Sequence, residues 1–165
     1  MNRDGLAELG VPDLLRLHGD VLDELRRREV LRSSNGPSGD YGELLFCRAF
    51  GWALSDNSTA GYDATDTAGV RYQIKCRRLT AHNQSRQLSF IRKLPERPFD
   101  VLAGVLLDSD FRVFKAALIP VSVVQERAAY VAHVNAWRLL LRDLIWNVPD
   151  VQDVTETLKA VEGTI

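Results

Sequence analysis

The sequence predicts an α/β protein, in which strands form a central sheet and helices cover it. Three stretches carry this prediction. Residues 11 to 33 place leucine and valine at steps of three and four, which is the period of an amphipathic helix. Residues 70 to 77 alternate apolar and polar side chains, which is the period of a strand with one buried face. Residues 99 to 107 are almost continuously apolar, as expected for a strand covered on both faces.

Length and composition predict a single domain, residues 1–165, with a hydrophobic core of its own. The chain is 45% hydrophobic and 26% charged, which is ordinary for a soluble globular protein. No apolar run approaches the roughly 20 residues that cross a bilayer, so we expect no membrane partner. The first residues lack the apolar segment of a secretory signal, and we expect a cytoplasmic protein. Its two cysteines, Cys47 and Cys76, are expected to be reduced.

The first predicted helix, 11–33, has Pro12 in its first turn and ends in a polar stretch rich in serine and glycine. This helix either packs on the core or forms a dimer arm. A second helix is predicted at about 40 to 53. Asp40 suits its N-cap, with Glu43 three residues later in a capping-box pattern.

The remaining elements follow from period and turn residues. A tight turn at 108–110 joins two predicted apolar strands into a hairpin, with Pro98 before the first strand and Pro120 after the second. Residues 133–146 are either a helix or a mixture of strand, turn and helix. The order along the chain is a short strand or turn (61–66), a strand (70–78), a polar loop (80–89), the hairpin (99–107 and 111–119), a helix (121–131), the mixed segment and a final helix (150–161).

Residues 61 to 78 carry the clearest chemistry. Gln73 and Lys75 are two residues apart on a strand, so they project from the same face. A hairpin with the preceding segment would place Asp63 beside them. A carboxylate, an amide oxygen and an ammonium group together suit a divalent metal next to a phosphate. Asp66 is the competing acid, but its position suits capping of the turn before Gly69.

This stretch resembles the PD-(D/E)xK nuclease superfamily. The motif residues are Asp63 and Gln73-Ile74-Lys75. Most members of the superfamily have an acid at the position of Gln73, and the glutamine here is similar to the one in Mrr-type restriction enzymes. Gly39-Asp40-Tyr41 with Glu43, and Gly61-Tyr62-Asp63, also resemble an uncharacterised bacterial family of small restriction-endonuclease-like proteins. The resemblance implies an αβββαβ core (39–131) with a mixed central sheet flanked by helices, an extra N-terminal helix (11–33) and C-terminal helical additions (132–165).

The function implied by the resemblance is a metal-dependent endodeoxyribonuclease that uses Mg²⁺ or Mn²⁺ and acts in restriction or defence. The metal ligands would be Asp63, Gln73, the backbone carbonyl of Ile74, and Glu43. Lys75 would orient the attacking water or stabilise the transition state. Because glutamine removes one negative charge, the alternative is a catalytically weak or inactive nucleic-acid-binding module with the same fold.

Positive charge is concentrated between Arg71 and Arg97, where eight basic residues stand against one acid, Glu96. A local positive field of this kind favours phosphate binding although the net charge of the chain is −1. An ordinary connecting loop is the alternative for 80–89. The predicted DNA contacts are Arg77, Arg78, His82, Asn83, Arg86, Arg92 and Lys93. Since a small enzyme that cuts both strands needs two sites, we expect a homodimer through the N-terminal helix or the C-terminal segment.

Overall fold

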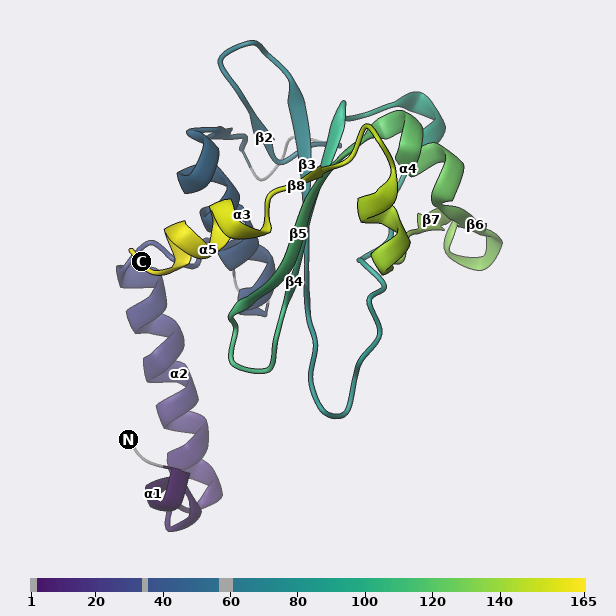
Figure 1. Ribbon diagram of the computed structural model, residues 1–165. Coiled ribbons are helices and arrows are strands. Elements are labelled where there is room, and N and C mark those ends of the chain that lie inside the picture. Colours follow the sequence, from purple (N-terminus) through teal and green to yellow (C-terminus); the bar gives the residue numbers. More distant parts are fainter. Residues whose placement is uncertain (1–2, 34–35, 57–60) are drawn as a thin grey trace.

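The computed structural model describes residues 3–33, 36–56 and 61–165, and its fold is mixed α/β. A six-stranded sheet occupies the centre, in the order β1-β2-β3-β4-β5-β8 (Figure 1). Neighbouring strands are antiparallel except for the parallel pair β3 and β4. The strands are β1 (Ala53–Leu54), β2 (Ala64–Thr65), β3 (Arg71–Arg78), β4 (Val101–Leu107), β5 (Val113–Pro120) and β8 (Gln152–Asp153).

The two central strands confirm the sequence predictions. In β3, Tyr72 and Ile74 are buried, and they alternate with side chains that face the other side of the sheet. Every residue of β4 from Leu102 to Leu107 is buried, because helices or extended chain cover both of its faces. The predicted hairpin of β4 with β5 is also present.

One face of the sheet is covered by α3 (Pro37–Phe50) and α5 (Thr155–Glu162). Leu45 and Phe46 of α3 are fully buried against Tyr72, Ile74 and their neighbours. The helix lies so close to β3 that a Cβ atom at Gly42 would stand 2.8 Å from the Cβ of Cys76. Trp52, just after the helix, stacks on Tyr72 with 3.7 Å between ring centroids.

The other face is covered by α4 (Val121–Arg127), by short 3-10 turns, and by a small hairpin of β6 (Ala129–Val131) and β7 (Ala136–Arg138). The chain from β3 to the parallel strand β4 also crosses this face. It contains no α-helix, only the 3-10 turn η1 (Leu94–Glu96). Bridges to the C-terminal segment hold it in place, with Gln87 paired to Leu140 and Ile91 paired to Trp137.

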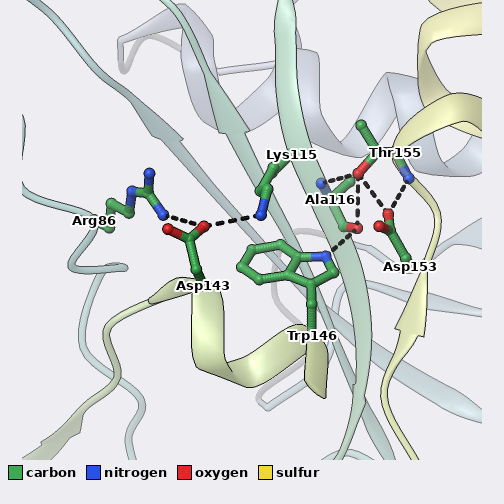
Figure 2. A network of polar contacts seen from close by, with 7 residues as sticks. All are labelled: Arg86, Lys115, Ala116, Asp143, Trp146, Asp153 and Thr155. Atoms are coloured by element: carbon green, nitrogen blue, oxygen red, sulfur yellow. Dashed lines mark hydrogen bonds and ion pairs between the residues drawn. The ribbon is translucent and has the colours of Figure 1, made fainter. Parts of the chain in front are cut away.

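A polar network ties these layers together at β5 (Figure 2). The carboxylate of Asp143, in the 3-10 turn η3 (Asp143–Asn147), accepts hydrogen bonds from Arg86 and Lys115, each at 2.8 Å. Trp146 of the same turn donates its indole N–H to the carbonyl of Ala116. On the far side of β5, the hydroxyl of Thr155 accepts from the Ala116 N–H at 3.0 Å. These hydrogen bonds connect the loop after β3, the strand β5 and the start of α5 to one another.

Several predicted helix boundaries were wrong. The first helix, α2 (Val11–Arg27), ends six residues before position 33, and a separate α1 (Arg3–Ala7) precedes it. Helix α3 begins at Pro37 and ends at Phe50, where Gly51 adopts φ 68° as its cap. Asp40 is therefore inside α3 and not at its N-cap. Its carboxylate instead accepts the N–H groups of Arg32 and Ser33, both at 2.7 Å.

The two ends of the chain also differ from expectation. None of the residues of α2 is buried, and the helix extends away from the sheet, so of the two alternatives for this helix, packing on the core was wrong (Figure 1). Helix α4 ends at Arg127, before β6, and 133–146 form two 3-10 turns around β7. The last helix begins at Thr155 because β8 precedes it and pairs with β5. Within the described ranges, none of the helices has the length and apolar character of a membrane span.

Close packing of α3 on β3 generates a stability prediction. Gly42→Ala should lower the free energy of unfolding by about 1–3 kcal/mol, because the new methyl group would collide with Cys76 and force the helix away from the strand. The matched control is Gly39→Ala in the same helix, where no atom lies within 4 Å of the new Cβ. That variant should be stabilised by up to about 1 kcal/mol. Urea unfolding measures both, and equal effects would contradict the packing described.

Candidate active site

Asp63 lies where the antiparallel pairing of β2 with β3 stops. Its N–H donates to the carbonyl of Tyr72 at 2.8 Å, and its carboxylate Oδ2 accepts the N–H of Ile74 at 2.6 Å. The Asp63 carboxylate therefore takes the place of a backbone carbonyl as the hydrogen-bond partner of Ile74, just beyond the last residue pair of β2 and β3. The N–H and C=O of one strand residue point to the same side, so the Ile74 carbonyl also faces this edge. The hairpin predicted from the sequence thus brings Asp63 to the middle of β3.

Glu43 approaches from the face of the sheet that α3 covers. Its side chain is 22% exposed, and its Oε2 is 3.4 Å from Nη1 of Arg32. Burial and, next, the negative charge of Asp63 raise the pKa of Glu43 to about 7, while Arg32 opposes the shift. Asp63 is therefore close enough to Glu43 for its charge to disfavour ionisation of that carboxylate.

Lys75 projects from the opposite face of β3. Burial lowers the pKa of Lys75, and the charge of Asp63 opposes that shift. Burial raises the pKa of Asp63. The hydrogen bond from the Ile74 N–H and the positive charges of Lys75 and Arg32 oppose this shift. Asp63 thus interacts with Glu43 on one side of the sheet and with Lys75 on the other.

Gln73 lies on the same face of β3 as Lys75, two residues before it. Its Oε1 is buried and has no hydrogen-bond partner among the described residues. Leaving a buried acceptor unsatisfied costs about 1–3 kcal/mol, so this atom is a natural ligand for a cation. No group of three or more His, Cys, Asp or Glu side chains gathers in the part of the chain that the structure describes. The amide oxygen of Gln73 is a hard ligand of the kind that Mg²⁺ and Mn²⁺ prefer.

Asp66 has the turn role expected from the sequence. Its Oδ1 accepts the N–H groups of Ala68 and Val70 at 2.9 and 3.0 Å, and its Oδ2 accepts the hydroxyl of Tyr72 at 2.9 Å. Gly69 takes φ 80° in the turn that this carboxylate closes. These bonds occupy both carboxylate oxygens of Asp66.

Arg32 is the residue of this region that the sequence reasoning missed. Besides facing Glu43, its guanidinium donates to the carbonyl of Ser55 at 3.3 Å. A single arginine between a helix and a serine-rich stretch carries no motif. Nothing in its spacing indicated an approach to Glu43, eleven positions along the chain.

Two of the predicted DNA contacts, Arg77 and Asn83, line one groove beside β3. The groove has a volume of about 520 Å³, and Ser85 and Gln87 add further polar groups to its wall. Arg77 lies on the same face of β3 as Lys75, and its Nε donates to the carbonyl of Ser85 at 3.1 Å. The groove lies beside the second half of β3, where Cys76 and Arg77 belong to its lining.

The other predicted contacts are dispersed. Arg78 points to the opposite face, where its Nε donates to the Ser109 carbonyl and its guanidinium lies 4.0 Å from the Phe111 ring centroid. Arg86 is engaged by Asp143. His82 is exposed in the loop after β3. The last two, Arg92 and Lys93, line a separate pocket together with Trp137.

No protein-family model matches this chain, and no curated protein matches its sequence. A functional assignment therefore depends on the chemistry of the side chains at β3.

The raised pKa of Glu43 predicts a pH dependence of stability. Between its ordinary value of 4.5 and about 7, the folded protein holds a proton that the unfolded chain has lost, so stability falls as pH rises through this range. Without metal, Glu43→Gln should remove this loss and be more stable than wild type at pH 8, by on the order of 2 kcal/mol.

Urea unfolding in EDTA at pH 5 and pH 8 measures the effect. The control is Glu156→Gln, which removes an 84%-exposed carboxylate from a surface pair with Lys159. If the wild type and Glu43→Gln show parallel pH dependence, Glu43 ionises as a solvated carboxylate, contrary to the buried site described.

Proposed function

We propose that this protein is a metal-dependent nuclease that hydrolyses phosphodiester bonds in DNA. The observation that carries the proposal is the position of Asp63, whose Oδ2 accepts the N–H of Ile74 at 2.6 Å, between Gln73 and Lys75 on β3. Its charge raises the pKa of Glu43 and opposes the lowering of the pKa of Lys75. The unsatisfied Oε1 of Gln73 supports it, because a cation would supply the partner that this atom lacks.

In this proposal the cation is held by Asp63, Glu43, Gln73 and the carbonyl of Ile74. A bound Mg²⁺ or Mn²⁺ would lower the pKa of a water molecule and offset the charge of the scissile phosphate. Asp63 would be held in position by the N–H of Ile74, which fixes one oxygen and leaves the other for a ligand. Arg32 would limit the repulsion between Glu43 and Asp63.

Lys75 would act on the substrate. Its burial means that a negative oxygen beside it is screened little by water, so the ammonium group stabilises developing charge strongly. Asp63 favours the charged form of Lys75 and so keeps the proton available at Nζ. In the adjoining groove, Arg77 and the amide of Asn83 would contact the phosphates that flank the scissile bond.

A restriction-endonuclease-like core belongs to the same proposal. The antiparallel run β1-β2-β3 and the parallel neighbour β4 are compatible with it, with Asp63 before β2 and Gln73 and Lys75 on β3. The connection between β3 and β4 departs from an αβββαβ order, since it contains a 3-10 turn and no α-helix. The proposed fold is therefore a variant of that core.

A catalytically weak or inactive nucleic-acid-binding module is the second candidate. Two observations favour it. Gln73 is neutral where a carboxylate would bind a cation more strongly, and Glu43 is paired with Arg32 and has a pKa of about 7. Near neutral pH, both of these lower the negative charge available to a metal.

We also propose that the protein forms a homodimer through α2. Leu14, Leu15 and Val21 are 37%, 67% and 50% exposed on this helix, although leucine and valine gain free energy when buried. A second copy would cover them and would supply the second active site that a duplex cut needs. The mass of the particle in solution, from light scattering, decides between a monomer and this dimer.

Lys75→Ala should abolish cleavage and leave the fold intact, because its ammonium group is needed in the transition state more than in substrate binding. Plasmid cleavage with Mn²⁺ and with EDTA measures the activity, and circular dichroism checks the fold. Lys159→Ala, which removes an exposed lysine of α5, is the control and should cleave like wild type. Cleavage by a folded Lys75→Ala protein would contradict the mechanism, and EDTA-resistant cleavage would contradict the metal.

Asp63→Asn should weaken Mn²⁺ binding at least about tenfold, because a charged first ligand is lost. Asp66→Asn should leave the affinity within about twofold of wild type, because its carboxylate closes a turn. Calorimetric titration of the two variants compares them directly. A larger loss at Asp66 would show that the wrong acid is assigned to the metal.

Gln73→Glu should tighten Mn²⁺ binding, because it is nearly isosteric and adds a carboxylate to a site that has two. Its effect on cleavage reports on Glu43. Tighter binding with slower cleavage places Glu43 beside the cation, where a third carboxylate repels the phosphate. Tighter binding with retained cleavage makes Glu43 a partner of Arg32 alone. Unchanged affinity would mean that Gln73 does not face the cation.

A further inference from the structure

A second basic pocket lies on the sheet face that α4 covers, and its lining contains none of the predicted DNA contacts. Its volume is about 300 Å³, and three arginines line it: Arg127, Arg138 and Arg142. No acidic side chain belongs to its lining. The remaining wall includes Leu140 and Leu144, and Leu144 is 67% exposed.

Three different elements bring the arginines together. Arg127 is the last residue of α4, and the chain passes at once into β6. Arg138 ends β7, where it is paired with Ala129 of β6. Arg142 immediately precedes η3, and its N–H donates to the carbonyl of Leu140 at 2.9 Å. The hairpin and the turn thus fold back on the end of α4.

The charge of this pocket is uncompensated. Within the described residues, no hydrogen bond or ion pair joins the side chains of these arginines to an acid. The acid next to Arg142 in sequence, Asp143, already accepts from Arg86 and Lys115. A cation at the end of α4 is favoured by the helix dipole, but this accounts for Arg127 alone. Three guanidinium groups around one small pocket repel each other, and an anion would remove that cost.

We infer that this pocket binds a nucleoside phosphate, either as part of a nucleic-acid strand or as a free nucleotide. Guanidinium groups match the oxygens of a phosphate in paired hydrogen bonds, and the exposed leucine side chain offers an apolar contact for a sugar or base. The choice of ligand rests on the proposed nuclease function, which it deepens by adding a second holding point for the strand.

The position of the pocket agrees with that role. Leu141, between Arg138 and Arg142, lies over Gly104, where a Cβ would be 2.9 Å from its Cδ1 atom. Gly104 pairs with Lys75 across the parallel strands. The pocket therefore belongs to the same face of the sheet from which Lys75 projects.

Binding is measured in EDTA, so that no cleavage occurs. The probes are a fluorescent 12-nucleotide single-stranded DNA, followed by anisotropy, and dAMP and inorganic phosphate as competitors. The variants are Arg138→Gln and the double variant Arg127→Gln with Arg142→Gln. Arg48→Gln is the control, since it removes one exposed arginine from α3. Circular dichroism checks each protein, and the double variant tests the pocket if Arg138→Gln fails to fold.

The pocket variants should bind the DNA about tenfold more weakly, and the slope of log affinity against log salt should fall by about 0.7 for each lost phosphate contact. Arg48→Gln should stay within about twofold of wild type. Competition by dAMP that the variants lose supports a nucleotide pocket, whereas a loss for DNA without competition by dAMP supports a strand contact. Equal binding by all variants, or competition by inorganic phosphate as strong as by dAMP, would overturn the inference.

Failure of the nuclease proposal gives a different result. Lys75→Ala should keep the arginine-dependent DNA binding. A wild-type protein that binds through these arginines but never cleaves would disprove the nuclease and leave the pocket standing.

Discussion

The parallel pairing of β3 with β4 is the constraint on which the rest of the fold depends. Parallel neighbours cannot be joined by a tight turn, so the chain must return across a face of the sheet. Here residues 79 to 100 make that return. They pack over the hydrophobic cluster on the sheet face that α4 covers, and they line the groove beside β3. The other edge of β3 pairs with β2 only as far as Tyr72, and this leaves Ile74 to meet the carboxylate of Asp63.

Burial gives the residues at this edge their chemical character. Glu43 and Asp63 resist ionisation because water is scarce around them, and Lys75 resists protonation for the same reason. For each of these groups, a neighbour of opposite charge favours the ionised form: Arg32 does so for the acids, and Asp63 for the lysine. Such mutually compensated groups with shifted pKa values are typical of functional sites, although structural ion pairs produce them as well.

The sequence predicted what depends on local period. Alternation at 70–77 and the apolar run at 99–107 identified the two central strands, and the short spacing between Asp63 and β3 predicted their meeting. Contacts between distant segments were beyond it. Asp40 has a capping pattern, but tertiary contacts with the chain before α3 determine its partners. The loop after β3 lacks a period because isolated bridges to a segment some 50 residues later hold it.

Asp143 gives the groove an unusual sensitivity to its solvent. This single carboxylate is 67% exposed, yet it fastens the loop through Arg86 and the sheet through Lys115 (Figure 2). Dissolved ions screen exposed pairs of this kind far more than the buried contacts around them. Added salt should therefore loosen the wall of the groove beside β3, while the buried contacts around it persist. How firmly this wall is held in place therefore depends on the ionic strength of the solution as well as on the sequence.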